Sequence, residues 1–188
     1  MKGVVINILE DFIAENLGDE MLEEVYEKVK LSDDVPPFIM PKTYPDEDLL
    51  NIVVFLSEKT GKSVEELLFG FGQYAFNILA RKFPVFFENT SSAKDFLKTI
   101  EDIIHVEVHK LYKDAVTPAI LIDDSVDGKT LIRYSSPRIL CDLMIGLLEG
   151  VAVKFNETIT QKHIQCMKNG ASECVLEVEF CNERKNNE

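Results

Sequence analysis

Apolar residues recur every three to four positions through the first two thirds of the chain, which is the spacing of one face of an α-helix. The helices that this spacing predicts cover residues 4–17, 21–29, 47–59, 63–83 and 92–112. Asp46 is the expected cap of the third helix, and the order Ser63-Val-Glu-Glu66 is a capping box that opens the fourth. Three prolines make residues 31–44 a loop.

The period changes to about two after Pro118, which is typical of strands with one buried face. The strands predicted there cover residues 119–122, 129–134, 157–167 and 174–180, with hairpin turns at Asp127-Gly128 and Asn169-Gly170. Between the hairpins, Pro137 can open a helix that runs to Phe155. Helices followed by an antiparallel sheet predict an α+β fold.

This pattern predicts one domain over residues 1–182, followed by a polar tail at 183–188. Within the domain we expect a helical lobe over about residues 1–62 and a lobe of helices and sheet over about residues 63–182. Two such lobes can close on a flat ligand. A chain of 188 residues is long enough to bury roughly 70% of the surface that its unfolded form exposes.

The composition narrows the classes of function. A net charge of −13 disfavours binding to nucleic-acid backbones and to anionic membranes. No apolar run approaches the ~20 residues that span a bilayer, and the first residues do not follow the pattern of a signal peptide. We therefore expect a cytoplasmic protein without membrane insertion. Its four cysteines are then expected to be thiols or metal ligands before structural disulfides.

The most informative motif begins at the end of the strand predicted at 129–134. Tyr134, Ser136 and Arg138 alternate along an extended segment, so their side chains can project to the same side. A guanidinium binds a carboxylate through two parallel charge-assisted hydrogen bonds, and the two hydroxyls add directed donors. The motif therefore predicts a carboxylate-binding site, although short triplets of common polar residues also arise by chance.

A histidine lies at the edge of the apolar face of the helix predicted at 92–112. That face is formed by Phe96, Leu97, Ile100, Ile104, Val108 and Leu111. His105 lies at its boundary, and His109 lies further toward the polar side. A neutral imidazole at this boundary can present Nε2 to a buried iron while Nδ1 is held by an acceptor. On this helix alone, a boundary histidine with a purely structural role is the alternative.

Together with Pro118 after this helix and the opening Met1-Lys2-Gly3, these residues resemble the heme nitric oxide/oxygen binding (H-NOX) family, bacterial relatives of the heme domain of soluble guanylate cyclase. The resemblance covers essentially the whole chain. It implies that the tyrosine, serine and arginine of the motif bind the propionates of heme b between the lobes. It also implies that His105 is the proximal iron ligand and that Pro118 belongs to the cofactor-binding residues.

The resemblance also bears on the choice of gas. Family members that hold oxygen usually carry a distal tyrosine as a hydrogen-bond donor, whereas this chain has Leu143 at the matching position. It has Leu9 where such members carry a tryptophan. Nitric oxide binds ferrous heme without such a donor, so the likeness implies selectivity for nitric oxide. Tyr74, on the helix that resembles the distal side, is another candidate donor, but we expect it to pack in the core.

His163, Cys166, Cys174 and Cys181 gather in the last predicted hairpin. The turn brings Cys166 opposite Cys174, and three thiolates with one imidazole form a closed tetrahedral zinc site. His163 and Cys181 differ from these two cysteines by odd steps, so a bulge or a strand end must reorient them. Free buried thiols or a disulfide are the alternatives. Some members of the resembled family carry such a cluster here, which implies Zn²⁺, while Cys141 is expected in the core.

These features favour a gas sensor without catalysis. In this hypothesis nitric oxide binds ferrous heme, weakens the iron bond to His105 and frees the proximal helix to move. The resemblance implies a separate partner, such as a histidine kinase or a cyclic-di-GMP enzyme. One alternative is a heme enzyme that consumes peroxide or nitric oxide, although the distal candidates include no histidine with a cationic neighbour. Another is a redox sensor in which the zinc and thiol cluster is primary.

Overall fold

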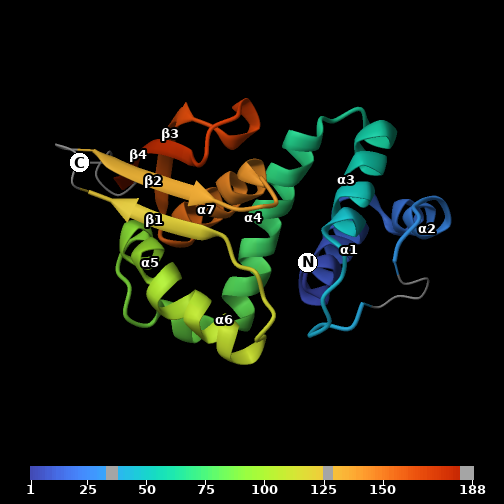
Figure 1. The fold of residues 1–188 in the computed structure, drawn as a ribbon, viewed down its shortest axis with the longest axis horizontal. Coiled ribbons are helices and arrows are strands. Elements are labelled where there is room, and N and C mark those ends of the chain that lie inside the picture. The colour runs from blue at the N-terminus through green and yellow to red at the C-terminus, as the bar shows by residue number, and fades with distance from the viewer. Residues whose placement is uncertain (33–37, 125–128, 183–188) are drawn as a thin grey trace.

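The computed structural model describes residues 1–32, 38–124 and 129–182 (Figure 1). Its helices are α1 (Gly3–Leu17), α2 (Asp19–Lys28), α3 (Asp46–Thr60), α4 (Val64–Lys82), α5 (Ala93–Thr99), α6 (Val106–Leu111) and α7 (Cys141–Lys154). Its strands are β1 (Ala119–Asp123), β2 (Thr130–Ser135), β3 (Glu157–Gln165) and β4 (Cys174–Asn182). A π-helical segment, Ile100–His105, joins α5 to α6, and short 3-10 turns occupy Pro84–Phe87 and Met167–Asn169. The predicted α+β fold class is confirmed.

The strands form an antiparallel sheet in the order β1-β2-β4-β3, so β1 and β3 are its edges. Both predicted strand pairs, β1 with β2 and β3 with β4, are present. The turn expected at Asp127-Gly128 lies outside the described residues. The turn between β3 and β4 is confirmed, and Gly170 adopts there the left-handed φ of 87° that favours glycine.

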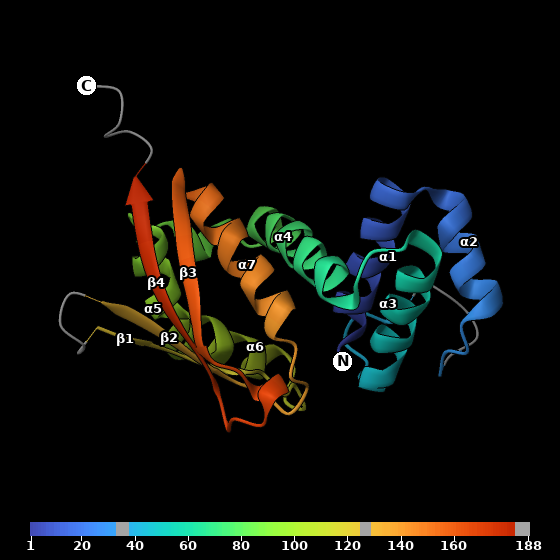
Figure 2. The same ribbon diagram turned by 90° about the horizontal axis from the view of Figure 1, so that it is seen from above.

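Buried apolar side chains gather in an N-terminal and a C-terminal cluster. The N-terminal cluster joins α1, α3 and the first part of α4, where Ile13, Leu49 and Phe71 are completely buried. The C-terminal cluster joins the end of α4, α5, α7 and the inner face of the sheet, around Ile132 and Leu148. Figure 2 shows α4 between the sheet at one end of the molecule and α1, α2 and α3 at the other. This helix therefore connects the two clusters.

Glycines allow α4 and α7 to pack in close contact. A Cβ atom on Gly72 would lie 2.3 Å from the carbonyl oxygen of Leu143, and one on Gly146 would lie 2.0 Å from the carbonyl oxygen of Phe69. Both distances are far below van der Waals contact, so a larger residue at either position would force the two backbones apart. The packing of α4 on α7 is thus fixed by residues without side chains.

The sequence predicted the N-terminal cap of α4 correctly and that of α3 incorrectly. The capping box is confirmed, because the amide of Glu66 donates to Ser63 Oγ at 3.1 Å and the amide of Ser63 donates to Glu66 Oε2 at 2.8 Å. The prediction that Asp46 caps α3 is wrong. Pro45 holds that position, and Asp46 lies in the first turn, where its carboxylate bonds to partners distant in sequence.

The helix predicted from Pro137 begins only at Cys141. Before it, Ser136 Oγ accepts a hydrogen bond from the amide of Arg138 at 3.2 Å, which closes a local turn. Ile139 then adopts a left-handed φ of 52°, a conformation that no helix residue has. The chain therefore makes a corner between β2 and α7, and residues 136–140 belong to neither element.

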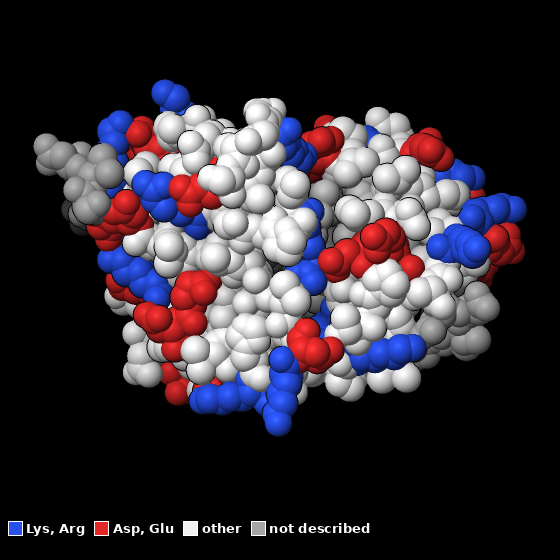
Figure 3. All heavy atoms as spheres, viewed as in Figure 1, with Lys and Arg blue, Asp and Glu red and all other residues white. Residues whose placement is uncertain are grey.

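The charges of the chain are spread over its surface. Figure 3 shows acidic and basic side chains interspersed over one face, including its middle, between broad uncharged areas. The net charge of −13 is therefore not gathered into one acidic patch on this face. Within the described ranges, no helix is both long enough and apolar enough to cross a membrane.

Candidate functional site

The Tyr-x-Ser-x-Arg motif occupies the corner between β2 and α7. Tyr134 and Ser136 are only 3% and 4% exposed, and the Ser136 side chain neighbours the Tyr134 phenol. Ser136 Oγ also bonds to the amide of Arg138, which brings all three residues together. Burial raises the pKa of Tyr134 above its ordinary value, so the phenol keeps its proton and remains a donor.

The guanidinium of Arg138 already binds a carboxylate. Nε donates to Asp46 Oδ1 at 2.7 Å, and Nη1 donates to the carbonyl oxygen of Val116 at 2.7 Å. Burial would raise the pKa of Asp46, but hydrogen bonds from Arg138 and from the amino group of Met1 outweigh it and lower the pKa. Arg138 therefore joins the start of α3, the loop between α6 and β1, and its own corner.

His105 ends the π-helical segment that interrupts the helix predicted at 92–112. Its side chain is 13% exposed, and its Nδ1 lies 3.1 Å from Oε1 of Glu101. Burial lowers the pKa of His105, and Glu101 offsets only part of this effect, so the neutral imidazole is favoured. With Nδ1 engaged, Nε2 is the nitrogen for a metal. His109 is exposed, and its Nε2 lies 3.1 Å from Thr117 Oγ1.

The apolar face that carries His105 is buried at its beginning, half-buried at Ile100 and Ile104 against the C-terminal cluster, and exposed at its end. Phe96 and Leu97 are buried in the C-terminal cluster, whereas no residue of the π-helical segment or of α6 is buried. Leu111, predicted on the same face, is 67% exposed. This open apolar surface lies on the segment that leads through Val116 to the motif. It fits a flat apolar group with acidic substituents, so the residues present fit heme.

Leu9 and Leu143, expected around the open face of the heme, both lie in apolar surroundings. Leu9 is buried in the N-terminal cluster, and Leu143 on α7 is half-buried against the same cluster. Neither side chain offers a hydrogen-bond donor. Pro118 is half-buried immediately before β1. A ligand between α1 and α7 would therefore meet hydrocarbon at these positions.

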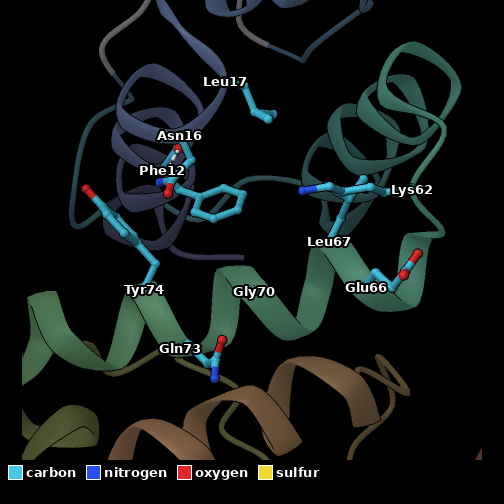
Figure 4. A pocket seen from close by; sticks show the side chains of 9 residues that line it. All are labelled: Phe12, Asn16, Leu17, Lys62, Glu66, Leu67, Gly70, Gln73 and Tyr74. Atoms are coloured by element: carbon cyan, nitrogen blue, oxygen red, sulfur yellow. Dashed lines mark hydrogen bonds between the residues drawn. The ribbon is translucent and has the colours of Figure 1, made fainter.

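Tyr74 lines a hollow of about 430 Å³ between α1 and α4 (Figure 4). Its ring meets the ring of Phe12 edge-on, with the ring centres 5.6 Å apart, and it packs against the N-terminal cluster. Burial, followed by the nearby Glu15, raises the pKa of Tyr74 to about 12, so the phenol stays protonated. The hydroxyl itself is buried and has no hydrogen-bond partner among the described residues.

Cys141, Cys166 and Cys174 meet beside the motif. The sulfur of Cys174 lies 2.9 Å from that of Cys141 and 3.7 Å from that of Cys166, and the other pair is 3.9 Å apart. Cys141 begins α7, and Cys174 pairs with Tyr134 across the sheet. Burial raises the pKa of Cys141 and of Cys174, which favours the thiol over the thiolate when no cation is bound.

The structure brings together only part of the set of ligands expected in the last hairpin. Cys166 and Cys174 lie close together as predicted, and Cys141, which is buried in the core as expected, is the third thiol of the group. Cys181 is seven residues further along β4, about 23 Å away at ~3.3 Å per residue, and is exposed. His163 is exposed, the sheet register shifts just after it, and it lies outside the thiols that approach within 4.8 Å of one another.

Comparison with known proteins places this geometry in a family. Residues 2–163 match the family model described as "Haem-NO-binding". The chain belongs to this family. Members of the family bind heme, and the H-NOX fold is that of heme-based gas sensors.

Solved H-NOX structures share the fold along nearly the whole chain. An H-NOX protein from S. oneidensis in the Fe(II)NO ligation state is 32% identical, with a TM-score of 0.89 over 97% of this chain and 100% of that one. An H-NOX domain from Shewanella oneidensis in the Fe(II)CO state is 33% identical, with a TM-score of 0.86 over 97% and 100%. An unliganded Fe(II) H-NOX protein from K. algicida, 22% identical, shows the fold alone, with a TM-score of 0.87 over 97% and 98%. No curated protein matches the chain.

Proposed function

We propose that this protein is a nitric oxide sensor that binds heme b through His105 and signals by conformational change to a separate protein. The observation that carries the proposal is the joint placement of a half-buried neutral imidazole, a carboxylate-binding corner and a partly exposed apolar surface. The family supports the same cofactor. A single histidine ligand would leave one heme face for a gas.

Tyr134, Ser136 and Arg138 would hold the carboxylates of the heme. The two hydroxyls lie in a buried corner, where hydrogen bonds to an anion are strong. A guanidinium has five N–H donors, and the bonds to Asp46 and Val116 use Nε and Nη1. A propionate can therefore share Arg138 with Asp46, which would tie the start of α3 to the cofactor.

Heme, when bound, would supply the ferrous iron at which a gas binds. Leu9 and Leu143 lack the donor that bound oxygen needs, whereas nitric oxide does not require one. The ring of Tyr74 packs beside Phe12 in the N-terminal cluster, which supports a packing role. We therefore propose selectivity for nitric oxide.

His105 would act as the tether of a loosely covered segment. The π-helical segment and α6 have no fully buried side chain, so the packing of the half-buried Ile100 and Ile104, the tether and the contacts at the ends would hold them. After α6, Val116 bonds to Arg138, and Asp114 bonds to Lys2. Release of Nε2 would let this segment move, and these bonds would carry the movement to α1 and α3. A histidine kinase or a cyclic-di-GMP enzyme is the proposed reader of the changed surface.

The test is the absorption spectrum of the reduced protein after hemin is supplied, first in air and then with nitric oxide. We expect a ferrous heme that persists in air and a shifted Soret band with nitric oxide. His105→Gly should lose the heme unless imidazole is added, while His109→Gly, at an exposed position of the same helix, should retain it. Protein that stays colourless contradicts the proposal. Enzymatic turnover of peroxide or nitric oxide would favour a heme enzyme instead.

The thiol cluster favours a second role. We propose that Cys141, Cys166 and Cys174, with His163 turned inward as the fourth ligand, hold a structural Zn²⁺ whose loss on oxidation is a redox input. Metal analysis of protein purified under reducing conditions should find about one zinc per chain. Cys166→Ser should abolish it, and Cys181→Ser should leave it. Zinc retained by Cys166→Ser, or absent from the original protein, contradicts this role.

A further inference from the structure

The carboxylate of Glu101 joins the histidine segment to the sheet. Its Oε1 accepts a hydrogen bond from the amide of Ile120 at 2.7 Å and lies 3.1 Å from Nδ1 of His105. Ile120 belongs to β1, an edge of the sheet, so this amide would otherwise face outward from the ladder. A carboxylate oxygen that accepts from the Ile120 amide can also accept from Nδ1–H, so this contact fits the tautomer with the proton on Nδ1. One oxygen therefore fixes both the imidazole tautomer and the edge strand.

The register of the sheet places this bridge beside the carboxylate-binding corner. Ile120 is paired with Tyr134 across β1 and β2. Because the amide of Ile120 points toward Glu101 and away from β2, this is a pair without direct backbone bonds, in which the two chains lie closest. A displacement of Glu101 would therefore shift Ile120 and, through it, the paired backbone of Tyr134.

The backbone around Glu101 suits this bridge. Glu101 and His105 lie near opposite ends of the π-helical segment, which is embedded between α5 and α6. A π turn inside an α-helix re-aims the side chains around it and occurs frequently at functional sites. The carboxylate is 31% exposed, so hydrogen bonding and not packing accounts for its position.

We propose that Glu101 is the positioning residue of His105 and the link that carries release of this histidine to β1. The inference rests on the proposed function. A carboxylate acceptor at Nδ1 raises the electron density of the imidazole and strengthens the bond that Nε2 makes to a metal. When Nε2 is released, Glu101 keeps the ring oriented. The ring then does not rotate independently, so movement of the segment also moves Glu101 and the Ile120 amide that it binds.

Two substitutions separate the parts of this role. Glu101→Gln keeps an oxygen that can accept from the Ile120 amide but removes the charge that polarises His105. Glu101→Ala removes both. Glu107→Gln is the matched control, because Glu107 lies on the same continuous helix and bonds at the surface to Lys110.

The first readout needs no heme. In heme-free protein, amide hydrogen exchange at Ile120 should become roughly tenfold faster in Glu101→Ala, the effect of losing one hydrogen bond. Glu101→Gln and Glu107→Gln should stay within about twofold of the original rate. An unchanged rate in Glu101→Ala overturns the link to β1, whether or not the protein binds heme.

The second readout uses the reduced, heme-loaded protein. Resonance Raman should show a lower iron–histidine stretching frequency in both Glu101 variants, and release of His105 on addition of nitric oxide should be roughly tenfold faster. Glu107→Gln should match the original protein in both. If both Glu101 variants keep the stretching frequency and the release rate of the original protein, the positioning role is overturned. An original protein that takes up no heme refutes the proposed function and the positioning role together, while exchange at Ile120 still decides the link.

Discussion

α7 and the segment from Ile100 to Leu111 both carry an apolar face, but the protein buries only that of α7, whereas Ile100 and Ile104 in the other segment are half-buried. α7 buries Met144, Leu148 and Val151 against α4 and the sheet. In the other segment, no residue is buried. Apolar periodicity is equally clear in both, so periodicity alone does not tell which face the polypeptide itself will cover. The difference marks the second face as a surface for a group that is not part of the chain, and heme fits it.

The largest expected effect contrasts these two faces. Leu148→Ala should lower the free energy of unfolding by about 3 kcal/mol, because it empties a site that is only 3% exposed. Leu111→Ala, at a site that is 67% exposed, should change it by less than about 0.5 kcal/mol in heme-free protein. Urea unfolding followed by circular dichroism measures both. Similar losses would show that the second face is covered by the chain after all.

A smaller effect tests how α7 is held. Gly72→Ala should lower the free energy of unfolding by about 2 kcal/mol, because its Cβ would meet the Leu143 carbonyl oxygen at 2.3 Å. Gly70→Ala, two residues earlier in α4, has Phe12 as its nearest neighbour at 3.8 Å. It should raise the free energy by about 0.5–1 kcal/mol, since alanine loses less entropy in a helix. An unchanged free energy of unfolding in Gly72→Ala would show that α4 and α7 can move apart at their contact without loss of stability.

The sequence predicted those parts of the fold that depend on local chemistry. The capping box at Ser63 follows from residue types at fixed spacing, and so do the strand pairs. The start of α7 could not be read in this way. Pro137 suits the first turn of a helix, and only the bond between Ser136 and the Arg138 amide, with the left-handed Ile139, shows that the chain turns once more.

In the candidate site, too, the sequence predicts what depends on neighbouring residues and misses what depends on contacts distant in the chain. The boundary position of His105 follows from local periodicity. Arg138 does not continue the extended segment that the alternation of the motif predicted, because it lies in the turn that Ser136 closes. The bond from Arg138 to Asp46 joins residues 92 positions apart, and no local pattern contains it. Cys141 reaches the other thiols only through the pairing of β2 with β4. For Glu101 a signal was present, since an acid four residues before a histidine shares its helix face.

Asp46→Asn tests how the uncovered segment is held at its end. Asparagine keeps an acceptor oxygen but loses the charge that pairs with Arg138, so the free energy of unfolding should fall by about 1 kcal/mol. Amide exchange should become faster around Val116, where Arg138 binds the loop, and remain unchanged in α7. Glu47→Gln, exposed in the same helix turn, should alter neither quantity. Equal rates of amide exchange around Val116 in Asp46→Asn and Glu47→Gln would show that Asp46 does not help Arg138 to hold the loop.

The smallest expected effect is a pH dependence at the same end. Lys2 Nζ and Thr43 Oγ1 each donate to the carboxylate of Asp114 at 2.6 Å, and they lower the pKa of Asp114 to about 2. This folded value lies below the ~3.9 of an unfolded aspartate, so the carboxylate contributes stability fully above about pH 4 and loses it as the pH falls toward 2. The stability difference between the original protein and Asp114→Asn should therefore shrink over that range.

Urea unfolding at each pH measures this difference, and Asp102→Asn supplies the control, because Asp102 is exposed on the π-helical segment. Asp102→Asn should keep the pH dependence of the original protein between about pH 4 and pH 2. A constant difference for Asp114→Asn over the same range would mean that Lys2 and Thr43 do not hold the loop through this carboxylate. Of the two ties to Lys2 and Arg138 at the end of this segment, only the bond between Arg138 and Val116 would then remain, and the contrast with the buried face of α7 would be larger.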